Sequence, residues 1–370
     1  MPGSDGVDAP SDAIDVPRWR GLATEEEAPV SKVSTIGLDL AKDVFQVHGA
    51  DVAGAVVFRK RLRRTSVLQF FALQPQCTVA MEACAGSHYW GREIARLGHN
   101  VRLIPPSYVK PFVKRQKNDA ADAEAICEAS QRPTMRFVQV KSEASQAAAV
   151  VFRARDLLVR QRTQIINALR GHLAEFGVVV AKGPAHVERL IAQAADQSHP
   201  LPEVMRPVLG VLIETLHLLD EKVTVLDAEI ARRAEEDEDA RRLKTIPGIG
   251  PVTAAAISAL APPPQTFVRA RDFAAWLGLT PLQRSTGGKQ KLGKTSKRGE
   301  RTLRRLLIIG ASAVVRWAAR KGAPVGSWLE RMLARKPRML VTVALANKMA
   351  RIVWALLTKG EIYRASIAAA

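Results

Sequence analysis

Five short apolar segments separated by turn residues, together with two helical patterns, follow one another between residues 33 and 104. This succession constrains the fold more than any other feature, because period-two segments at hairpin spacing and helical segments between later strands build one sheet. The strands are expected at 33–40, 44–48, 55–59, 77–81 and 101–104, and the helices at 66–73 and 88–97. Completed by a helix near Asp119, the order predicts an α/β domain with a mixed sheet over residues 31–140.

Two carboxylates, Asp119 and Asp122, lie three residues apart in the Ala-rich run that follows Lys117. In a helix they face the same side about one turn apart, where like charges repel unless a cation lies between them. Taken alone, the pattern is explained better by a helix N-terminus, with Asn118 or Asp119 as the cap and acids that complement the helix dipole.

Two further acids shift this balance. Asp39 lies inside the apolar first strand, and Glu82 falls where the fourth strand ends. An unpaired carboxylate is costly to bury, and the ends of strands in α/β sheets face the ligand crevice. Four acids at strand ends and on one helix face favour a metal site, for which Mg²⁺ (or Mn²⁺) is the expected ion because it prefers carboxylate oxygens.

The formal net charge of +19 indicates an anionic partner, most simply nucleic acid. Residues 1–30 are rich in Pro, Gly and acid and carry a net charge of −5, which leaves +24 for the remainder. This segment is expected to be a disordered acidic tail. Three cysteines without a CxxC pair, no signal-peptide pattern and no uninterrupted apolar run of about 18 residues predict a cytoplasmic protein without a membrane span.

Long helical patterns occupy residues 141–242. Residues 143–177 carry one apolar stripe, 183–202 reads as a looser connector, and three heptads follow in the next helix. The a and d positions of these heptads are Leu209, Leu212, Leu216, Leu219, Val223, Leu226 and Ile230. The repeat fits an antiparallel hairpin with 143–177 within one chain, and it fits a dimer seam equally.

A glycine-rich turn at 246–253 links two helical stretches. Backbone N–H groups at Gly248 and Gly250, beside a helix N-terminus, could hold a phosphate, as in a helix-hairpin-helix element. A plain glycine turn between packed helices explains the same residues equally well.

Residues 281–322 contain twelve cations opposed only by Glu300, which indicates a nucleic-acid surface. The expected contacts to nucleic-acid backbone are Arg284, Lys289, Lys291, Lys294, Lys297, Arg298, Arg301, Arg304 and Arg305. Ser285 lies in a loop of small residues among these cations, where an exposed hydroxyl beside a cationic phosphate cradle suits a nucleophile. A phosphate-contacting role for Ser285 stays open, and Thr286, Thr295 and Ser296 are competing hydroxyls.

In order and spacing, these motifs resemble a transposase of the insertion sequence 110 family, and most of all the subgroup named for insertion sequence 1111. The resemblance covers residues 33–357. The matching motifs are Gly37-Leu38-Asp39, Met81-Glu82-Ala83, Lys117–Ala123, Ile246–Gly250, Ser285–Lys289, Leu292–Gly299 and Leu303-Arg304. Glu300, where the family more often has Asn or Asp, and the acidic tail depart from its pattern.

The resemblance implies an RNase H-like (RuvC-like) DEDD domain at 31–140, a helical coiled-coil region at 141–242, a mostly helical transposase domain at 243–360 and a tail at 361–370. It assigns the metal to Asp39, Glu82, Asp119 and Asp122 and the nucleophile to Ser285. It also implies an element-encoded guide RNA that pairs with donor and target DNA. The protein is expected to act as a homo-oligomer, a dimer or a tetramer, in which one protomer's serine completes another's acidic site, on the nucleoid of a bacterium.

The predicted function is therefore metal-dependent cleavage and rejoining of DNA that moves an insertion element. Two alternatives stay open. One is a metal-dependent RuvC-like junction nuclease without a covalent serine intermediate, and the other is a nucleic-acid-binding protein without enzymatic activity.

Overall fold

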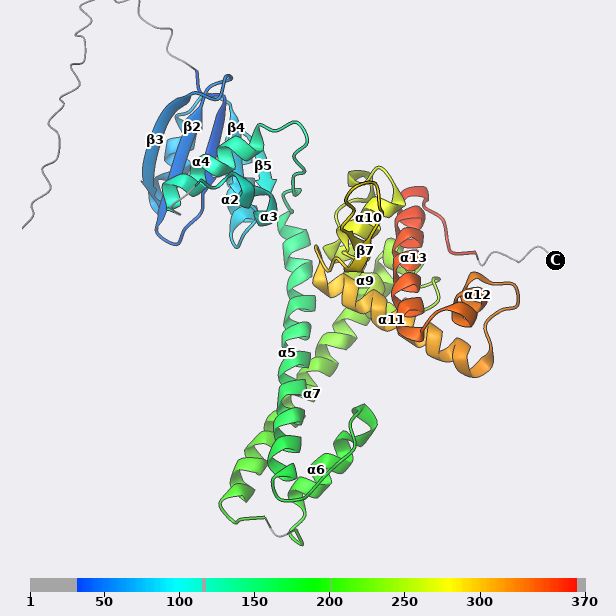
Figure 1. Ribbon diagram of the computed structural model, residues 1–370. Coiled ribbons are helices and arrows are strands. Elements are labelled where there is room, and N and C mark those ends of the chain that lie inside the picture. Colours follow the sequence, from blue (N-terminus) through cyan, green and yellow to red (C-terminus); the bar gives the residue numbers. More distant parts are fainter. Residues whose placement is uncertain (1–31, 115–117, 200, 365–370) are drawn as a thin grey trace, which may run out of the picture. The chain divides into compact units, whose positions relative to one another are not determined.

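The computed structural model describes residues 32–114, 118–199 and 201–364 (Figure 1). The predicted tail at 1–30, Lys117 and residues 365–370 of the predicted C-terminal tail lie outside the described residues. The chain divides into two compact units, Met1–Val140 and Lys141–Ala370. The predicted boundary between 141–242 and 243–360 lies inside the second unit and stays a prediction.

The first unit is built on a five-stranded sheet of order β3-β2-β1-β4-β5. Its strands are β1 Thr35–Asp39, β2 Val44–Ala50, β3 Val56–Arg63, β4 Thr78–Glu82 and β5 Asn100–Ile104. The β1–β2 and β2–β3 pairs are antiparallel, and the β1–β4 and β4–β5 pairs are parallel. The predicted mixed sheet is therefore confirmed, with β3 as an edge strand that continues four residues beyond the end expected at residue 59.

Helices cover both faces of this sheet. One core lies between the sheet and α1 (Val67–Ala72) and α2 (Ser87–Arg96), and it includes Phe45, Phe71 and Trp90. The other core lies under α4 (Asp119–Ser130), which crosses the opposite face (Figure 1). Short turns of helix, η1 Arg64–Ser66, α3 Pro106–Val109 and η2 Lys110–Phe112, complete the unit.

Helix α4 approaches β1 at Gly37 so closely that no side chain fits between them. A Cβ atom added at Gly37 would lie 2.2 Å from the carbonyl oxygen of Ala123 and 2.7 Å from the amide nitrogen of Cys127. Both atoms belong to the α4 backbone, which cannot rotate away as a side chain would. The glycine of the Gly37-Leu38-Asp39 motif therefore sets the distance between the helix and the strand that carry the acids.

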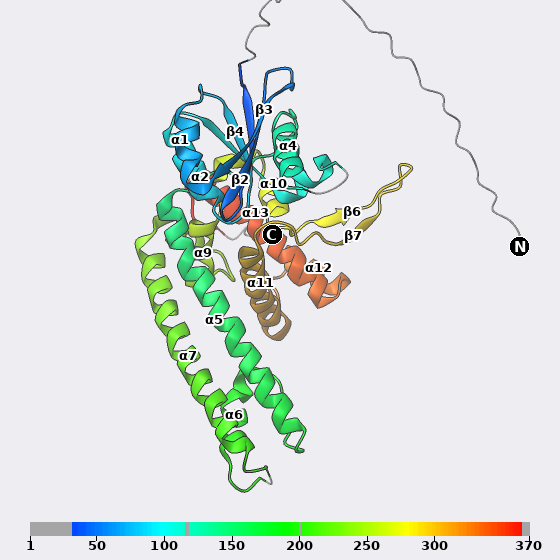
Figure 2. The same cartoon turned by 90° about the vertical axis from the view of Figure 1, so that its left-hand side faces the viewer.

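In the second unit, α5 (Glu143–Ala174) and α7 (Met205–Glu236) pack as an antiparallel pair (Figure 2). Arg155 forms an ion pair with Asp227, and seven residues further along α5 Arg162 forms one with Asp220. The heptad residues of α7 thus face a helix of the same chain, as the intramolecular alternative predicted. The dimer seam and the coiled-coil geometry stay predictions.

The segment expected to be a looser connector at 183–202 contains a helix, so this expectation was wrong. After the turn η3 (Pro184–His186), α6 spans Val187–Ala195 and buries Val187, Leu190 and Ala194 against the ends of α5 and α7. The spacings of three and four between these residues are those of an amphipathic helix. The flanking glycine and prolines obscured this short pattern.

The rest of the second unit is mostly helical around one large core. Its elements are α8 Glu238–Leu243, α9 Pro251–Leu260, η4 Pro264–Thr266, α10 Ala270–Trp276, β6 Pro281–Gln283, β7 Leu292–Thr295, α11 Arg301–Lys321, α12 Trp328–Arg335 and α13 Arg338–Lys359. By length and composition, α13 is the one described helix that could cross a membrane, yet Ala346, Met349 and Val353 belong to this core. Its apolar character is accounted for by packing.

We expect Gly37→Ala to lower the free energy of unfolding by about 1–3 kcal/mol, because the added methyl group forces α4 away from β1. Gly210→Ala is the control, since a Cβ at this position in α7 meets nothing within 4 Å. Alanine in a helix interior stabilises by about 1 kcal/mol relative to glycine, so this change has the opposite sign. Urea unfolding followed by circular dichroism measures both, and a Gly37→Ala protein as stable as the parent contradicts the prediction.

Candidate active site

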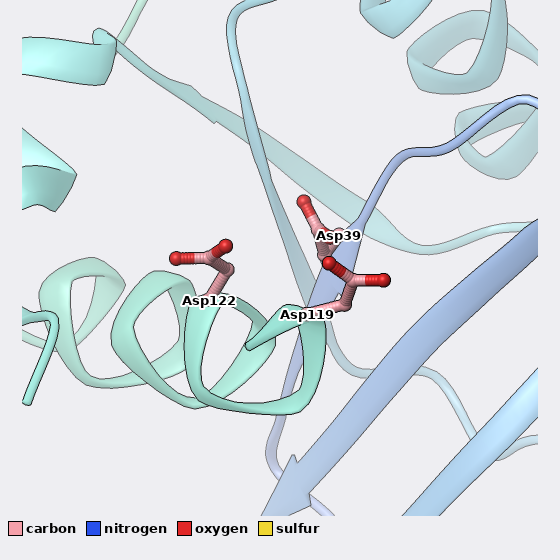
Figure 3. Close-up of side chains that lie close together, drawn as sticks. All are labelled: Asp39, Asp119 and Asp122. Carbon is pink, nitrogen blue, oxygen red and sulfur yellow. The ribbon is translucent and has the colours of Figure 1, made fainter. Parts of the chain in front are cut away.

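Three carboxylates converge where strand β1 ends. Asp39 is the last residue of β1, and Asp119 and Asp122 lie in the first turn of α4. One carboxylate oxygen from each lies within 4.8 Å of the others, and Figure 3 shows the three groups around a common space. Asp39 and Asp122 are half-buried and Asp119 is exposed. The structure therefore brings together three of the four predicted acids.

Asn118 sets the start of α4. It has an extended backbone, and its side-chain oxygen accepts a hydrogen bond from the Ala121 amide at 2.8 Å. Because Asn118 caps the helix, neither aspartate is needed as the cap. The helix cap at Asn118 is confirmed, and it is compatible with a metal site, because Asp119 and Asp122 face Asp39. The metal site itself stays a prediction.

Glu82 takes the neighbouring position on the adjacent strand. It follows Met81, the parallel partner of Leu38, just as Asp39 follows Leu38. Successive side chains alternate between faces, so Glu82 and Asp39 point to the same side of the sheet. The pKa of the nearby Cys84 thiol is raised by partial desolvation and then by the negative charges of Glu82 and Asp39. Glu82 thus contributes to the negative potential beside the cluster of three.

The oxygen geometry fits one small divalent cation. Oxygens on opposite sides of a Mg²⁺ ion lie about 4.2 Å apart, since each binds at about 2.1 Å. The 4.8 Å limit of the cluster requires only a small side-chain movement to reach this distance. An ion there would also offset the repulsion among the carboxylates, which the fold otherwise holds together.

Glu124 lies two residues beyond Asp122, and its charge is offset by two cations, Lys114 and Arg59. No sequence motif distinguishes it from the acids of the cluster. Its carboxylate lies 2.5 Å from Lys114 Nζ and 3.1 Å from a guanidinium nitrogen of Arg59. The hydrogen bond from Lys114, followed by the charges of Lys114 and Arg59, holds the pKa of Glu124 below its usual range despite partial desolvation. The acidic centre therefore ends at Asp122 along this helix.

Ser285 lies in the second unit, in the exposed connection of the β6–β7 hairpin. Its Oγ accepts a hydrogen bond from Gln283 Nε2 at 3.1 Å and another from the Lys291 amide at 3.3 Å. Thr286 is exposed as well, whereas Thr295 and Ser296 are half-buried where the hairpin ends. Exposure therefore leaves Ser285 and Thr286 as the accessible hydroxyls, and two N–H donors converge on Ser285.

Most of the predicted nucleic-acid contacts are exposed. They are Arg284, Lys289, Lys291, Lys294, Lys297, Arg298 and Arg301. Arg304 instead donates to the carbonyl oxygens of Leu277 and Arg298, at 2.9 and 2.8 Å, and burial lowers its pKa. Arg305 forms an ion pair with Asp156 at 2.6 Å. The guanidinium groups of Arg304 and Arg305 thus have partners within the second unit, unlike the seven exposed cations.

Gly248 has a structural reason to be glycine. Its φ is +88°, and an added Cβ would lie 2.8 Å from the carbonyl oxygen of Gly310 in α11. Gly250 is exposed and precedes α9, with open space around it. Packing thus explains Gly248, and phosphate binding at this turn stays a prediction.

Family models and relatives match the units that carry these features. The model described as "Transposase IS116/IS110/IS902 family" matches residues 240–324, which include the β6–β7 hairpin. A second transposase model, for a DEDD domain of the IS110 type, matches residues 36–177. The chain is 49% identical to "Probable family 20 transposase" of Pseudomonas aeruginosa over 334 residues, 90% of this chain and 99% of that protein.

The chain belongs to the IS116/IS110/IS902 family of transposases. Like the other members, this transposase is an enzyme of DNA cleavage and rejoining, and its DEDD domain implies an RNase H-like fold and divalent metal dependence. It is 41% identical to "Transposase for insertion sequence element IS1328" of Yersinia enterocolitica, over 90% of this chain and 98% of that one. It is 40% identical to "Transposase for insertion sequence element IS1111A" of Coxiella burnetii, over 90% of this chain and 92% of that one. The individual site residues, the serine nucleophile, the guide RNA and the oligomer stay predictions.

We expect a divalent metal to stabilise the transposase through the three aspartates. At a concentration one hundred times its Kd, a ligand adds about 2.7 kcal/mol to the free energy of unfolding. In the Asp119→Asn variant this gain disappears. Without metal, the variant differs from the parent by less than about 1 kcal/mol in its free energy of unfolding, because the relief of repulsion offsets the weaker interaction with the helix dipole.

Thermal unfolding with MgCl₂, MnCl₂ or a chelator measures the effect. Glu128→Gln is the control, because Glu128 lies on the same helix but pairs with Arg132 at 2.6 Å, outside the cluster. Equal metal-dependent shifts in both variants would contradict the assignment.

Proposed function

We propose that this transposase mobilises an insertion element by cutting and rejoining DNA at a metal centre formed by its acidic residues. The convergence of Asp39, Asp119 and Asp122 from two elements carries the proposal. Such a group of carboxylates at the end of a central strand suits phosphoryl transfer on a nucleic-acid backbone.

Asp39, Asp119 and Asp122 would hold Mg²⁺ or Mn²⁺, with Glu82 as a fourth acid on the adjacent strand. When bound, the ion stabilises negative charge on the phosphate and on the leaving oxygen. The acids themselves fix its place between β1 and α4, since both elements are held by buried packing.

We further propose that Ser285 is the nucleophile. Its Oγ would form a bond to the phosphorus of the scissile phosphodiester while the bond to one sugar oxygen breaks. The hydroxyl proton passes to solvent, and the leaving oxygen takes up a proton, so charge balances. The N–H groups of Gln283 and Lys291 support this role, because donors aimed at Oγ stabilise negative charge on it as the proton leaves.

Cations of the same hairpin would hold the DNA. Arg284, Lys289, Lys291 and Lys294 are exposed around Ser285 and have the chemistry to contact backbone phosphates without reading bases. Sequence recognition would then fall to an element-encoded guide RNA that pairs with donor and target DNA. In keeping with the family resemblance, the protein would act as a dimer or tetramer in the bacterial cytoplasm.

A metal-dependent junction nuclease that does not use Ser285 is the second candidate. It is favoured by the match to a DEDD domain, which points to metal chemistry and not to a serine. The two candidates differ in whether protein becomes covalently joined to DNA.

We expect wild-type protein with element-derived RNA, Mg²⁺ and labelled donor DNA to give a protein-linked product on a denaturing gel. Ser285→Ala and Asp122→Ala lower its yield at least about a thousandfold, because each removes a group that acts on the same bond. Thr286→Ala is the matched control, since its hydroxyl is exposed one residue away, and it keeps the product.

Free nicked DNA in equal amounts from wild type and Ser285→Ala, without a protein-linked band, would establish the nuclease instead. A reaction without the RNA tests the proposed guide. If the RNA directs cutting, the protein-linked product disappears when the RNA is omitted.

A further inference from the structure

The edge strand β3 carries an unusual density of positive charge. Within Arg59–Arg64, five of six residues are Lys or Arg, and each of the five is exposed; four of them lie in β3, and Arg64 follows it directly as the first residue of η1. These residues lie in the DEDD unit, outside the basic segment at 281–322. Cations of a strand alternate between its two faces, so they form two separate sets.

The register across the sheet assigns Arg61 to the face of the acidic centre. Asp39 pairs with Gln46 on β2, and Gln46 pairs with Arg61 on β3. Side chains of residues paired across a sheet point to the same face. Two strand spacings of about 4.8 Å separate Asp39 from Arg61, which places their backbones about 10 Å apart. Arg63 lies two residues further along β3 on the same face.

Interactions elsewhere on the strand agree with this assignment. Arg59 lies on the same face and reaches Glu124 of α4 at 3.1 Å. On the opposite face, Lys60 lies over the rings of Phe58 and Phe70. Arg64, directly after the strand, lies over the Trp90 ring at 5.2 Å. Three of the five cations thus have internal partners.

Arg61 and Arg63 are the two that remain. Both are exposed, and among residues 32–114, 118–199 and 201–364 neither guanidinium group has a hydrogen-bond or ion-pair partner. Two unpaired guanidinium groups on one face, with no acid between them on the strand, have the charge and the hydrogen-bond donors that phosphate groups require.

We propose that Arg61 and Arg63 bind the backbone of the DNA strand that is cut at the Asp39, Asp119 and Asp122 centre. This inference rests on the proposed function, since it takes the acids as the place of cutting. A strand whose scissile phosphate lies at Asp39 continues across the same face, and about 10 Å corresponds to roughly three nucleotides of helical rise. Because Asp39, Gln46 and Arg61 are paired in one line across the sheet, the strand bound by Arg61 is the strand that reaches Asp39. We therefore take this strand to be the DNA that is cut, and not an RNA bound elsewhere.

The test measures binding apart from cutting. Full-length protein carrying Asp122→Asn is assembled with element-derived RNA, and its affinity for a labelled duplex spanning the element end is measured from about 50 to 200 mM salt. Arg61→Gln with Arg63→Gln is expected to raise Kd about tenfold and to reduce the slope of log K against log salt by about two, because each arginine neutralises one phosphate. Arg61→Lys with Arg63→Lys keeps the charge and restores the slope.

Lys60→Gln is the matched control, because Lys60 lies on the same strand, carries the same charge and faces the other way. It leaves Kd within about twofold of the parent and the salt slope unchanged. A neutral methylphosphonate at one of the three phosphates beside the scissile bond should weaken binding by the parent and not by Arg61→Gln. This coupling cannot arise from a general loss of folding.

Two results would overturn the inference. One is an equal salt slope in the Arg61→Gln, Arg63→Gln double variant and in the Lys60→Gln variant. The other is a loss confined to RNA binding, with the DNA affinity of the assembled complex unchanged. Failure of the proposed function is separately visible, because protein with Asp122 intact and the Asp122→Asn protein would then cut the duplex equally with Mg²⁺, or neither would cut it. Binding by Arg61 and Arg63 is read in the same samples without reference to cutting.

Discussion

The acidic centre depends on the distance at which α4 lies from strand β1. Gly37 permits backbone contact between the two, and two residues later Asp39 ends the strand beside the first turn of the helix. A larger residue at 37 would separate the elements that supply the carboxylates. The position of the site is thus decided by a residue with no side chain, through packing in the core beneath it.

The carboxylates bring a cost that the rest of the unit must offset. Three negative groups within 4.8 Å repel one another, and among the described residues no salt bridge joins Asp119 or Asp122 to a Lys or Arg. Two cations near the same helix, Arg59 and Lys114, are instead held by Glu124. The acidic centre therefore stays negative, and Glu82 on the adjacent strand adds to its negative potential, which is a setting for a metal ion.

The amino-acid sequence predicted the sheet and the helix faces because both leave periodic signals. Strands β1, β2, β4 and β5 fall where alternation and apolar runs placed them, and Asp119 and Asp122 share a face because of their spacing. Features that arise from tertiary contact left no such signal. The pairing of Arg305 with Asp156 joins residues far apart in the chain, and the close approach of Gly248 to Gly310 is visible only in three dimensions.

The paired helices α5 and α7 illustrate how charge completes what an apolar repeat leaves undetermined. A heptad pattern alone tolerates a slip of one helix by about seven residues, since leucines again meet apolar partners. The pairs Arg155–Asp227 and Arg162–Asp220 do not tolerate it. A slip in one direction places Arg162 opposite Ile213, and a slip in the other places Arg155 opposite Ala234. Each wrong alignment therefore keeps one ion pair and leaves one arginine and one aspartate unpaired. The leucines hold the two helices together, and the two arginines determine their register.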